Sequence, residues 1–214
     1  MNIIVFGATG GTGRATIDAL TSSGHSVTGF ARRPSALPPG IAHATGDVMN
    51  PADVAAAMPA HDAVVISLGN SQNPFAMMLG ARRTTPPDVC ATGTSHIIAA
   101  MQSHRITRVV IVSAYGIGAK RASLPLGFRL FYATILREHM DDKEHQEKLI
   151  KASNLDWTIV QPVGLTNKSA TGTWLASTTG EIRSQQISRA DTAAFIAATV
   201  TSGNYRQASV ALSG

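Results

Sequence analysis

The sequence predicts an α/β fold in which one doubly wound domain is built on a central parallel sheet. Short β-branched runs alternate with segments of helical spacing along the chain, and this alternation is typical of a parallel sheet covered by helices on both faces. The length of 214 residues corresponds to one compact unit. A content of 44% hydrophobic and 14% charged residues excludes disorder as the main state. We therefore expect residues 1–214 to form a single domain.

The strands are expected from apolar, β-branched runs, and the first run ends in Gly7 and should be buried on both faces. One helix should begin at Asn50, which can cap it, and Pro51 suits its first turn. The expected strands are 3–6, 26–30, 41–44, 63–67, 108–112, 157–160 and 208–212, and the expected helices are 12–23, one from 51, 89–103, 128–153 and 191–200.

Three long segments that follow strands, at 69–87, 114–127 and 162–189, are expected to be irregular. Ligands of open α/β sheets bind beyond the carboxyl ends of the strands. Long loops in compact domains are also more often functional than not. We therefore expect these three loops to form the walls of a substrate site.

Composition limits the environment and the partners. The one cysteine, Cys90, excludes an internal disulfide framework and suits a reducing compartment. No apolar run approaches the ~20 residues of a membrane span, and Met1 leads directly into a strand without a signal-like segment. A cytoplasmic protein is expected. The net charge of +5 suits an anionic ligand, but there is no basic stripe interleaved with aromatics, so we expect no nucleic acid. The seven histidines are scattered, and no metal site is expected.

A glycine-rich segment lies between the first strand and the first helix. Glycines at this place permit a tight turn and a close approach of the backbone to a pyrophosphate, which the helix N-terminus then faces with unpaired N–H groups. The alternative is a glycine-rich turn without a ligand. No Gly-Lys-Ser/Thr follows, which disfavours a kinase or NTPase. The residues expected to bind the dinucleotide here are Gly7, Ala8, Thr9, Gly10, Gly11, Thr12, Gly13 and Arg14.

The residues after the second strand indicate which dinucleotide is bound. An acidic residue there would accept hydrogen bonds from the ribose of NAD, but Arg32 and Arg33 stand at this point instead. Guanidinium groups form bidentate, charge-assisted bonds to phosphate, so NADP(H) is favoured over NAD(H). The alternative is a pair of solvated arginines. Asp47 and Val48 could flank the adenine.

Several motifs that follow one another along the chain resemble those of the atypical short-chain dehydrogenases/reductases that carry an NAD(P)H-binding domain. The similarity is closest to the biliverdin IXβ reductase/flavin reductase type, and the relatives include NmrA-like redox sensors, quinone reductases and sugar-nucleotide enzymes. The resemblance implies a Rossmann-like fold and a hydroxyl, that of Ser113, near the nicotinamide. Leu68, Gly69, Pro162 and Val163 complete the expected cofactor site. The motifs are the glycine-rich segment, Ala31–Pro34, Gly46–Val48, Val112–Tyr115, Leu155–Pro162 and Ile187–Ala193.

The chain lacks the Tyr-x-x-x-Lys pair of typical short-chain dehydrogenases. His139 and Lys143 have the same spacing and share one helix face, so His139 could donate a proton and Lys143 could touch the ribose. The alternative for both is a charged, solvated helix face. Ser113 is the best candidate to contact the reacting groups, and Tyr115 could stack on a flat substrate or cover the loop.

Reduction of a flavin or tetrapyrrole mainly requires the donor and the acceptor to be stacked, and the proton can come from water. The expected function is therefore NADPH-dependent transfer of hydride to a flat conjugated small molecule: FMN, riboflavin, a quinone or a biliverdin-like tetrapyrrole. A flavin would be a substrate rather than a tightly bound cofactor. One alternative is an NmrA-like sensor that binds NADP(H) and a protein partner without turnover. Another is an epimerase or dehydratase acting on a nucleotide-linked substrate.

Overall fold

The computed structural model describes residues 1–69, 82, 84–117 and 137–214. In this part of the chain, eight strands form a sheet in the order β3-β2-β1-β4-β5-β6-β10-β8. Neighbouring strands are parallel except for β8, which runs antiparallel to β10 at one edge. The strands are β1 (Asn2–Phe6), β2 (Ser26–Ala31), β3 (Ala42–Thr45), β4 (Ala63–Ile66), β5 (Arg108–Val112), β6 (Asp156–Pro162), β8 (Leu175–Ser177) and β10 (Ala208–Ser213).

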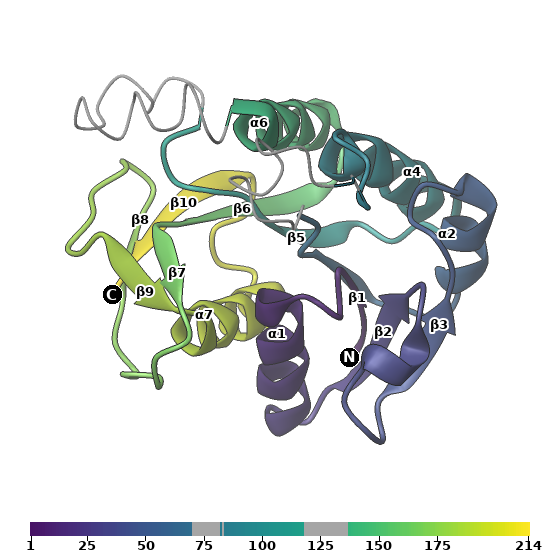
Figure 1. Ribbon diagram of the computed structural model, residues 1–214, viewed down its shortest axis with the longest axis horizontal. Helices are drawn as coiled ribbons and strands as arrows, with labels where there is room; N and C mark the ends of the chain where they lie inside the picture. The colour runs from purple at the N-terminus through teal and green to yellow at the C-terminus, as the bar shows by residue number, and fades with distance from the viewer. Residues whose placement is uncertain (70–81, 83, 118–136) are drawn as a thin grey trace.

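Helices cover both faces of the sheet (Figure 1). One layer contains α1 (Gly11–Ser22) and α7 (Arg189–Ser202), and the other contains α2 (Pro51–Ala57), α4 (Val89–Ser103) and α6 (Arg137–Ala152). A short 3-10 helix, η1 (Pro34–Ala36), follows β2. The doubly wound α/β fold predicted from the sequence is thus confirmed.

Alternating side chains of each central strand enter two separate cores. In β1, Ile4 and Phe6 pack with the apolar side chains of α2, α4 and α6, whereas Ile3 and Val5 pack with those of α1 and α7. All four side chains are fully buried. This is why the strand is a continuous apolar run rather than an alternating one.

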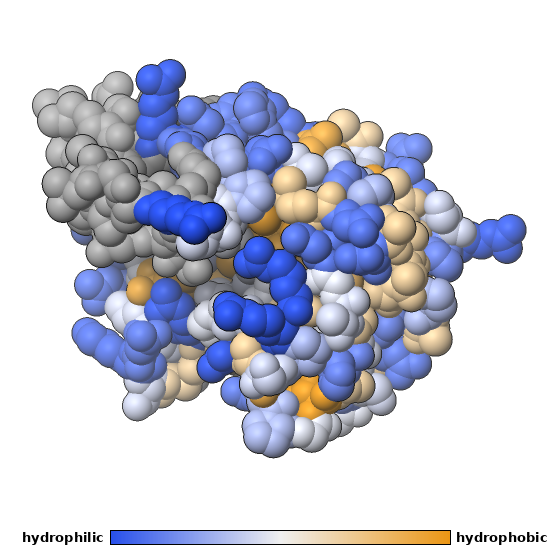
Figure 2. Space-filling model, turned by 45° about the vertical axis from the view of Figure 1, so that its right-hand side comes forward, coloured by the Kyte–Doolittle hydropathy of each residue, from blue (hydrophilic) through white to orange (hydrophobic). Residues whose placement is uncertain are grey.

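The face in Figure 2 is mainly hydrophilic, and its hydrophobic residues lie in small separate patches. Among the described residues, the exposed large hydrophobic side chains are those of Met1, Leu149 and Ile182. None of the helices in the described ranges combines the length and hydropathy that a bilayer crossing requires.

The element boundaries agree with the sequence in some places and differ in others. The ranges 89–103 and 108–112 match α4 and β5, and Asn50 caps α2 by accepting a 3.0 Å hydrogen bond from the N–H of Ala52. Most of the expected helix 128–153 is α6, and its first part, 128–136, lies outside the described residues, as do most of 69–87 and 118–127 of the loop 114–127.

The expectation that 162–189 is irregular was wrong. This segment contains β7 (Gly164–Thr166), β8 and β9 (Gln186–Ser188), and β7 pairs in parallel with β9 in a separate two-stranded sheet. Three-residue strands are too short to show a period in the sequence, and β8 is fixed by its pairing with β10. Because β8 runs antiparallel to β10, the central sheet is not wholly parallel at this edge.

Candidate functional site

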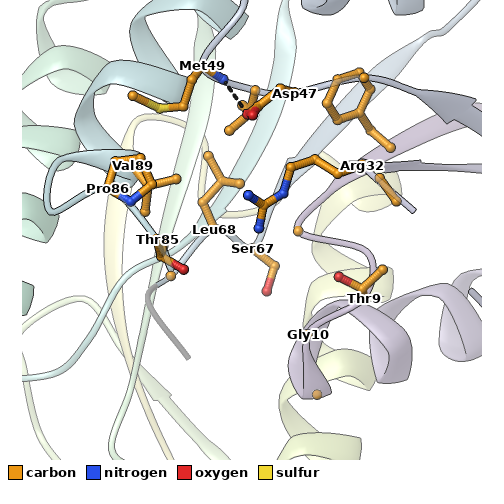
Figure 3. Close-up of a pocket in the computed structure, with 17 residues that line it drawn as sticks. Thr9, Gly10, Arg32, Asp47, Met49, Ser67, Leu68, Thr85, Pro86 and Val89 are labelled. Carbon is orange, nitrogen blue, oxygen red and sulfur yellow. Dashed lines mark hydrogen bonds between the residues drawn. The ribbon is translucent and has the colours of Figure 1, made fainter. Parts of the chain in front are cut away.

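A cavity of about 350 Å³ opens at the carboxyl ends of the central strands. It lies where the sheet order reverses, because β1 has β2 on one side and β4 on the other, and such a switch point is where doubly wound folds bind ligands. Residues from five segments of the chain line it, and Figure 3 shows how they surround the cavity. Its lining residues are Gly7, Thr9, Gly10, Gly11, Phe30, Ala31, Arg32, Gly46, Asp47, Val48, Met49, Ser67, Leu68, Gly69, Thr85, Pro86 and Val89.

The glycine-rich loop forms one wall of the cavity and depends on the lack of side chains. Gly7 has a φ of +80°, and a Cβ on it would collide with the carbonyl of Ser67; a Cβ on Gly13 would collide with the carbonyl of Gly7. The loop therefore packs tightly on the sheet. The helix α1 begins directly after Gly10 without a side-chain cap. Backbone N–H groups of its first turn can therefore bind an anion.

Arg32 reaches into the cavity from the end of β2. Its guanidinium points toward Ser67 and lies between Leu68 and the glycine loop (Figure 3). Arg33, the next residue, is exposed like Arg32 but is not one of the lining residues. The two arginines, which the sequence does not distinguish, thus differ in position.

An apolar wall faces Arg32 across the cavity. Val48, Met49, Leu68, Pro86 and Val89 contribute to it. Such a surface suits the flat face of an adenine. The loop before it is stiffened by the carboxylate of Asp47, whose Oδ1 accepts a 3.0 Å hydrogen bond from the N–H of Met49.

Not every residue expected to bind the cofactor lines the cavity. Ala8, Thr12 and Gly13 are buried within the loop and the first turn of α1. The guanidinium of Arg14 instead donates a 2.7 Å hydrogen bond to the carbonyl of Ala36 and holds η1. The expected residues that do line the cavity are Gly7, Thr9, Gly10, Gly11, Arg32, Asp47, Val48, Leu68 and Gly69.

Ser113, Pro162 and Val163 lie beside one another at the same edge of the sheet, and all three are buried. The N–H of Ser113 bonds the carbonyl of Val160 in β6, and the N–H of Tyr115 bonds that of Pro162. The hydroxyl of Tyr115 donates a 2.9 Å bond to the carbonyl of Gly180. These residues continue the sheet edge past the cavity, on the side of β5 and β6.

The helix α6 turns a polar face toward this edge. The ammonium of Lys143 donates to the carbonyls of Leu68 and Val112, both at 2.6 Å, and to the Oε1 of Gln146 at 3.1 Å. The side chain of His139, one turn away, is half-buried. The alternative interpretation, a wholly solvated helix face, is therefore wrong for this part of α6, because Gln146 and Glu147 are also buried. Roles of His139 and Lys143 in catalysis stay predictions.

Two charged residues beside the site were not predicted. Glu147 accepts a 2.6 Å hydrogen bond from the hydroxyl of Ser113. Arg189 lies against the glycine loop, because a Cβ on Gly11 would be only 2.9 Å from its Nε. Local sequence patterns cannot predict either contact, because both join residues far apart in the chain. Arg189 was part of the motif Ile187–Ala193, but that motif predicted only the start of a helix. Among the described residues, no group of three or more His, Cys, Asp or Glu is placed to hold a metal ion.

Residues 7–202 match the model of a protein family described as NAD(P)H-binding. The chain belongs to this NAD(P)H-binding family. The match begins at Gly7, the first residue of the loop that lines the cavity, and includes every strand from β2 to β9. The residues present also fit a dinucleotide. The glycines at 7 and 13 let the loop pack against the carbonyls of Ser67 and Gly7, and the uncapped first turn of α1 leaves backbone N–H groups for a pyrophosphate.

Solved structures of several other proteins share this fold. A short-chain dehydrogenase/reductase from Veillonella parvula in complex with NADP has a TM-score of 0.80 at 17% identity, over 100% of this chain and 94% of that one. ChuY from Escherichia coli O157:H7, described as an anaerobilin reductase, has a TM-score of 0.79 at 22% identity, over 99% and 96%. The oxidoreductase YlbE from Lactococcus lactis has a TM-score of 0.79 at 19% identity, over 100% and 91%. At these identities the likeness concerns the fold.

Proposed function

We propose that this protein is an NADPH-dependent reductase that transfers hydride to a flat conjugated small molecule. The observation that carries the proposal is the position of Arg32, whose guanidinium lies in the cavity between the glycine loop and Leu68. A guanidinium at the end of β2 suits a ribose 2′-phosphate, which it can bind through two parallel charge-assisted bonds. This favours NADP(H) over NAD(H).

Different residues are suited to bind different parts of the cofactor. The first turn of α1, after Gly10, suits the pyrophosphate, and the apolar wall around Val89 suits the adenine. Ser113, Pro162 and Val163 are assigned to the nicotinamide end because they lie farther along the same sheet edge. When bound, the nicotinamide supplies the hydride, and the protein orients donor and acceptor.

The acceptor is proposed to be FMN, riboflavin, a quinone or a biliverdin-like tetrapyrrole. The lack of a Tyr-x-x-x-Lys pair supports this class, because a stacked conjugated acceptor can take its proton from water. The description of the similar protein ChuY as an anaerobilin reductase also supports it. A cytoplasmic location, expected from the one cysteine, is part of the same proposal.

The test follows the absorbance of NADPH with purified protein and FMN, a simple quinone or biliverdin, with NADH in parallel. We expect oxidation above the uncatalysed background with at least one acceptor, and faster with NADPH than with NADH. Tight NADPH binding without turnover would instead favour the sensor. Conversion of a nucleotide-linked substrate without net NADPH consumption would favour an epimerase or dehydratase.

A further inference from the structure

Glu147, on α6, is a buried carboxylate on which three donors converge. Its side chain is held in an interior position, and the residue is 4% exposed. Oε1 accepts hydrogen bonds from the hydroxyl of Ser113 at 2.6 Å and from the amide of Gln161 at 2.8 Å, and Oε2 accepts one from the ammonium of Lys151 at 2.9 Å. An ionised carboxylate only accepts hydrogen bonds, and a buried one requires such partners. Glu147 is therefore the acceptor in all three bonds.

The bond to Glu147 determines what Ser113 can offer to a ligand. A serine hydroxyl has one hydrogen to donate and two lone pairs that can accept. Since the hydrogen of Ser113 is directed to Glu147, only the lone pairs of its oxygen remain for further bonds. In this state Ser113 cannot donate to a carbonyl.

Ser113 is linked to the cavity wall through its chain neighbour Val112 and the ammonium of Lys143. It directly follows Val112, the last residue of β5, whose carbonyl binds the ammonium of Lys143. The same ammonium binds the carbonyl of Leu68, which lines the cavity. The hydroxyl of Ser113 thus lies one strand beyond the cavity wall, at the sheet edge to which the nicotinamide end is assigned.

We infer that Glu147 is a positioning residue that fixes Ser113 as a hydrogen-bond acceptor, so that the ligand group at Ser113 must be a donor, which we assign to an N–H. This inference rests on the proposed function, and it narrows the substrate class if the acceptor rather than the cofactor supplies the N–H. The N–H can come from the carboxamide of the nicotinamide, or from a conjugated acceptor with a ring N–H, such as a flavin imide or a pyrrole. A quinone offers only carbonyl oxygens and cannot fill this position.

The first experiment measures binding of oxidised NADP and of its acetylpyridine analogue, in which a methyl replaces the carboxamide amino group. If the cofactor supplies the N–H, the wild-type protein should bind the analogue about five- to tenfold more weakly, the usual cost of one lost hydrogen bond. Ser113→Ala should bind the two equally. This variant removes one small oxygen from a folded site.

The second experiment covers the other source of the N–H. Calorimetry in the presence of oxidised NADP compares lumiflavin with a lumiflavin methylated on its imide nitrogen. If the acceptor supplies the N–H, the wild-type protein should prefer unmethylated lumiflavin by a similar factor, and Ser113→Ala should show no preference. The inference is overturned if the wild-type protein binds NADP and its analogue equally and also binds the two lumiflavins equally. It is likewise overturned if Ser113→Ala keeps the full preference that the wild-type protein shows.

A third experiment isolates Glu147. In Glu147→Gln the side chain can donate to Ser113, which releases the hydroxyl hydrogen, so the preference for the N–H probe should fall toward one. Lys151→Gln leaves the bond between Glu147 and Ser113 in place and should keep the preference. A folded Glu147→Gln protein with an unchanged preference would exclude the positioning role; if this variant does not fold, the first two experiments decide. Because every readout is a binding ratio, failure here is distinct from an absence of NADPH oxidation.

Discussion

The carboxylate of Asp142 accepts a 2.9 Å hydrogen bond from the backbone N–H of Cys90, so that α6 caps the first turn of α4. Its other oxygen accepts a 2.8 Å bond from the N–H of Ala91. The residue that precedes α4, Asp88, makes no side-chain cap of its own. The start of a helix that borders the cavity through Val89 is thus held by a residue some fifty positions later in the chain.

Asp142→Ala should lower the free energy of unfolding by about 1–3 kcal/mol, since two N–H groups lose their partner. Urea unfolding would measure the change. The matched control is Asp141→Ala, whose carboxylate is half-exposed and pairs only loosely with Arg137 at 3.6 Å; it should cost less than about 0.5 kcal/mol. Equal losses in the two variants would contradict the capping role.

Arg32→Ala should weaken NADPH binding by about ten- to a hundredfold, which corresponds to the loss of charge-assisted hydrogen bonds, and should leave NADH almost unaffected. Fluorescence titration gives both constants. Arg33→Ala is the neighbouring control, because Arg33 lies outside the cavity lining, and it should have the smaller effect. Equal weakening of NADPH and NADH by Arg32→Ala would refute the assignment to the 2′-phosphate.

Arg189→Ala should weaken the binding of NADPH and NADH by a similar factor, about three- to tenfold, because it removes a charge beside the pyrophosphate loop. The side chain is oriented by a 2.7 Å hydrogen bond from its Nη1 to the Oδ1 of Asn167. Arg189→Lys should recover part of the loss. Lys148→Ala, which removes an exposed charge on α6, is the control and should bind both dinucleotides normally. A loss confined to NADPH would show that Arg189 acts at another phosphate.

Stability should depend on the ionisation of Asp191 in acid. Its burial alone would raise the pKa, but hydrogen bonds from the backbone of Thr171, the hydroxyl of Ser188 and the backbone of Gly172 lower it below the ordinary 3.8. The carboxylate therefore stabilises the fold above that pH, and the contribution is lost as the pH falls through the lowered pKa.

Asp191→Asn should reduce the free energy of unfolding by about 1–3 kcal/mol near neutral pH. The difference from the wild-type protein should be constant above about pH 5 and shrink below about pH 4. Urea titrations across this range would measure it. Asp18→Asn, at an exposed position of α1, should show no such change; a difference for Asp191→Asn that persists undiminished in acid would contradict the prediction.

Cys90 should be unreactive in the folded protein. Burial, opposed by the charge of Lys143, raises the pKa of its thiol from 9.0 to about 11, so only about one molecule in a thousand carries the thiolate at pH 8. An aromatic disulfide reagent should react slowly at this pH and rapidly after unfolding in urea. A fast reaction of the native protein would show that Cys90 is accessible and ionised.

The parts of the fold that could be predicted from the sequence are those specified by neighbouring residues. The apolar run of β1, the glycine loop and the cap at Asn50 each depend on a few consecutive side chains, and the structure has all three. By contrast β7, β8 and β9 owe their existence to pairing with distant strands. A three-residue segment has no period of its own.

The same reasoning applies to the site. The role of Arg32 could be predicted because the residue that contacts the ribose of a bound dinucleotide stands at a fixed position after the second strand. The hydrogen bond between Glu147 and Ser113 could not be predicted, because the two residues are 34 positions apart and the charged stretch of α6 resembles a solvated face. Burial of that stretch becomes evident only when the helix is docked on the edge of β4 and β5, through Lys143.

The place of β10 in the sheet has a consequence for biosynthesis. This strand, at 208–213, is inserted between β6 and β8 rather than added at an edge. Ribosomal synthesis delivers the strands in chain order, so β8 emerges well before the strand that it pairs with. Until residues 208–213 have left the exit tunnel, β6 exposes an unpaired flank that can pair with another nascent chain. A stop codon just before Ala208 would make that exposure permanent, and we expect the shortened product to aggregate.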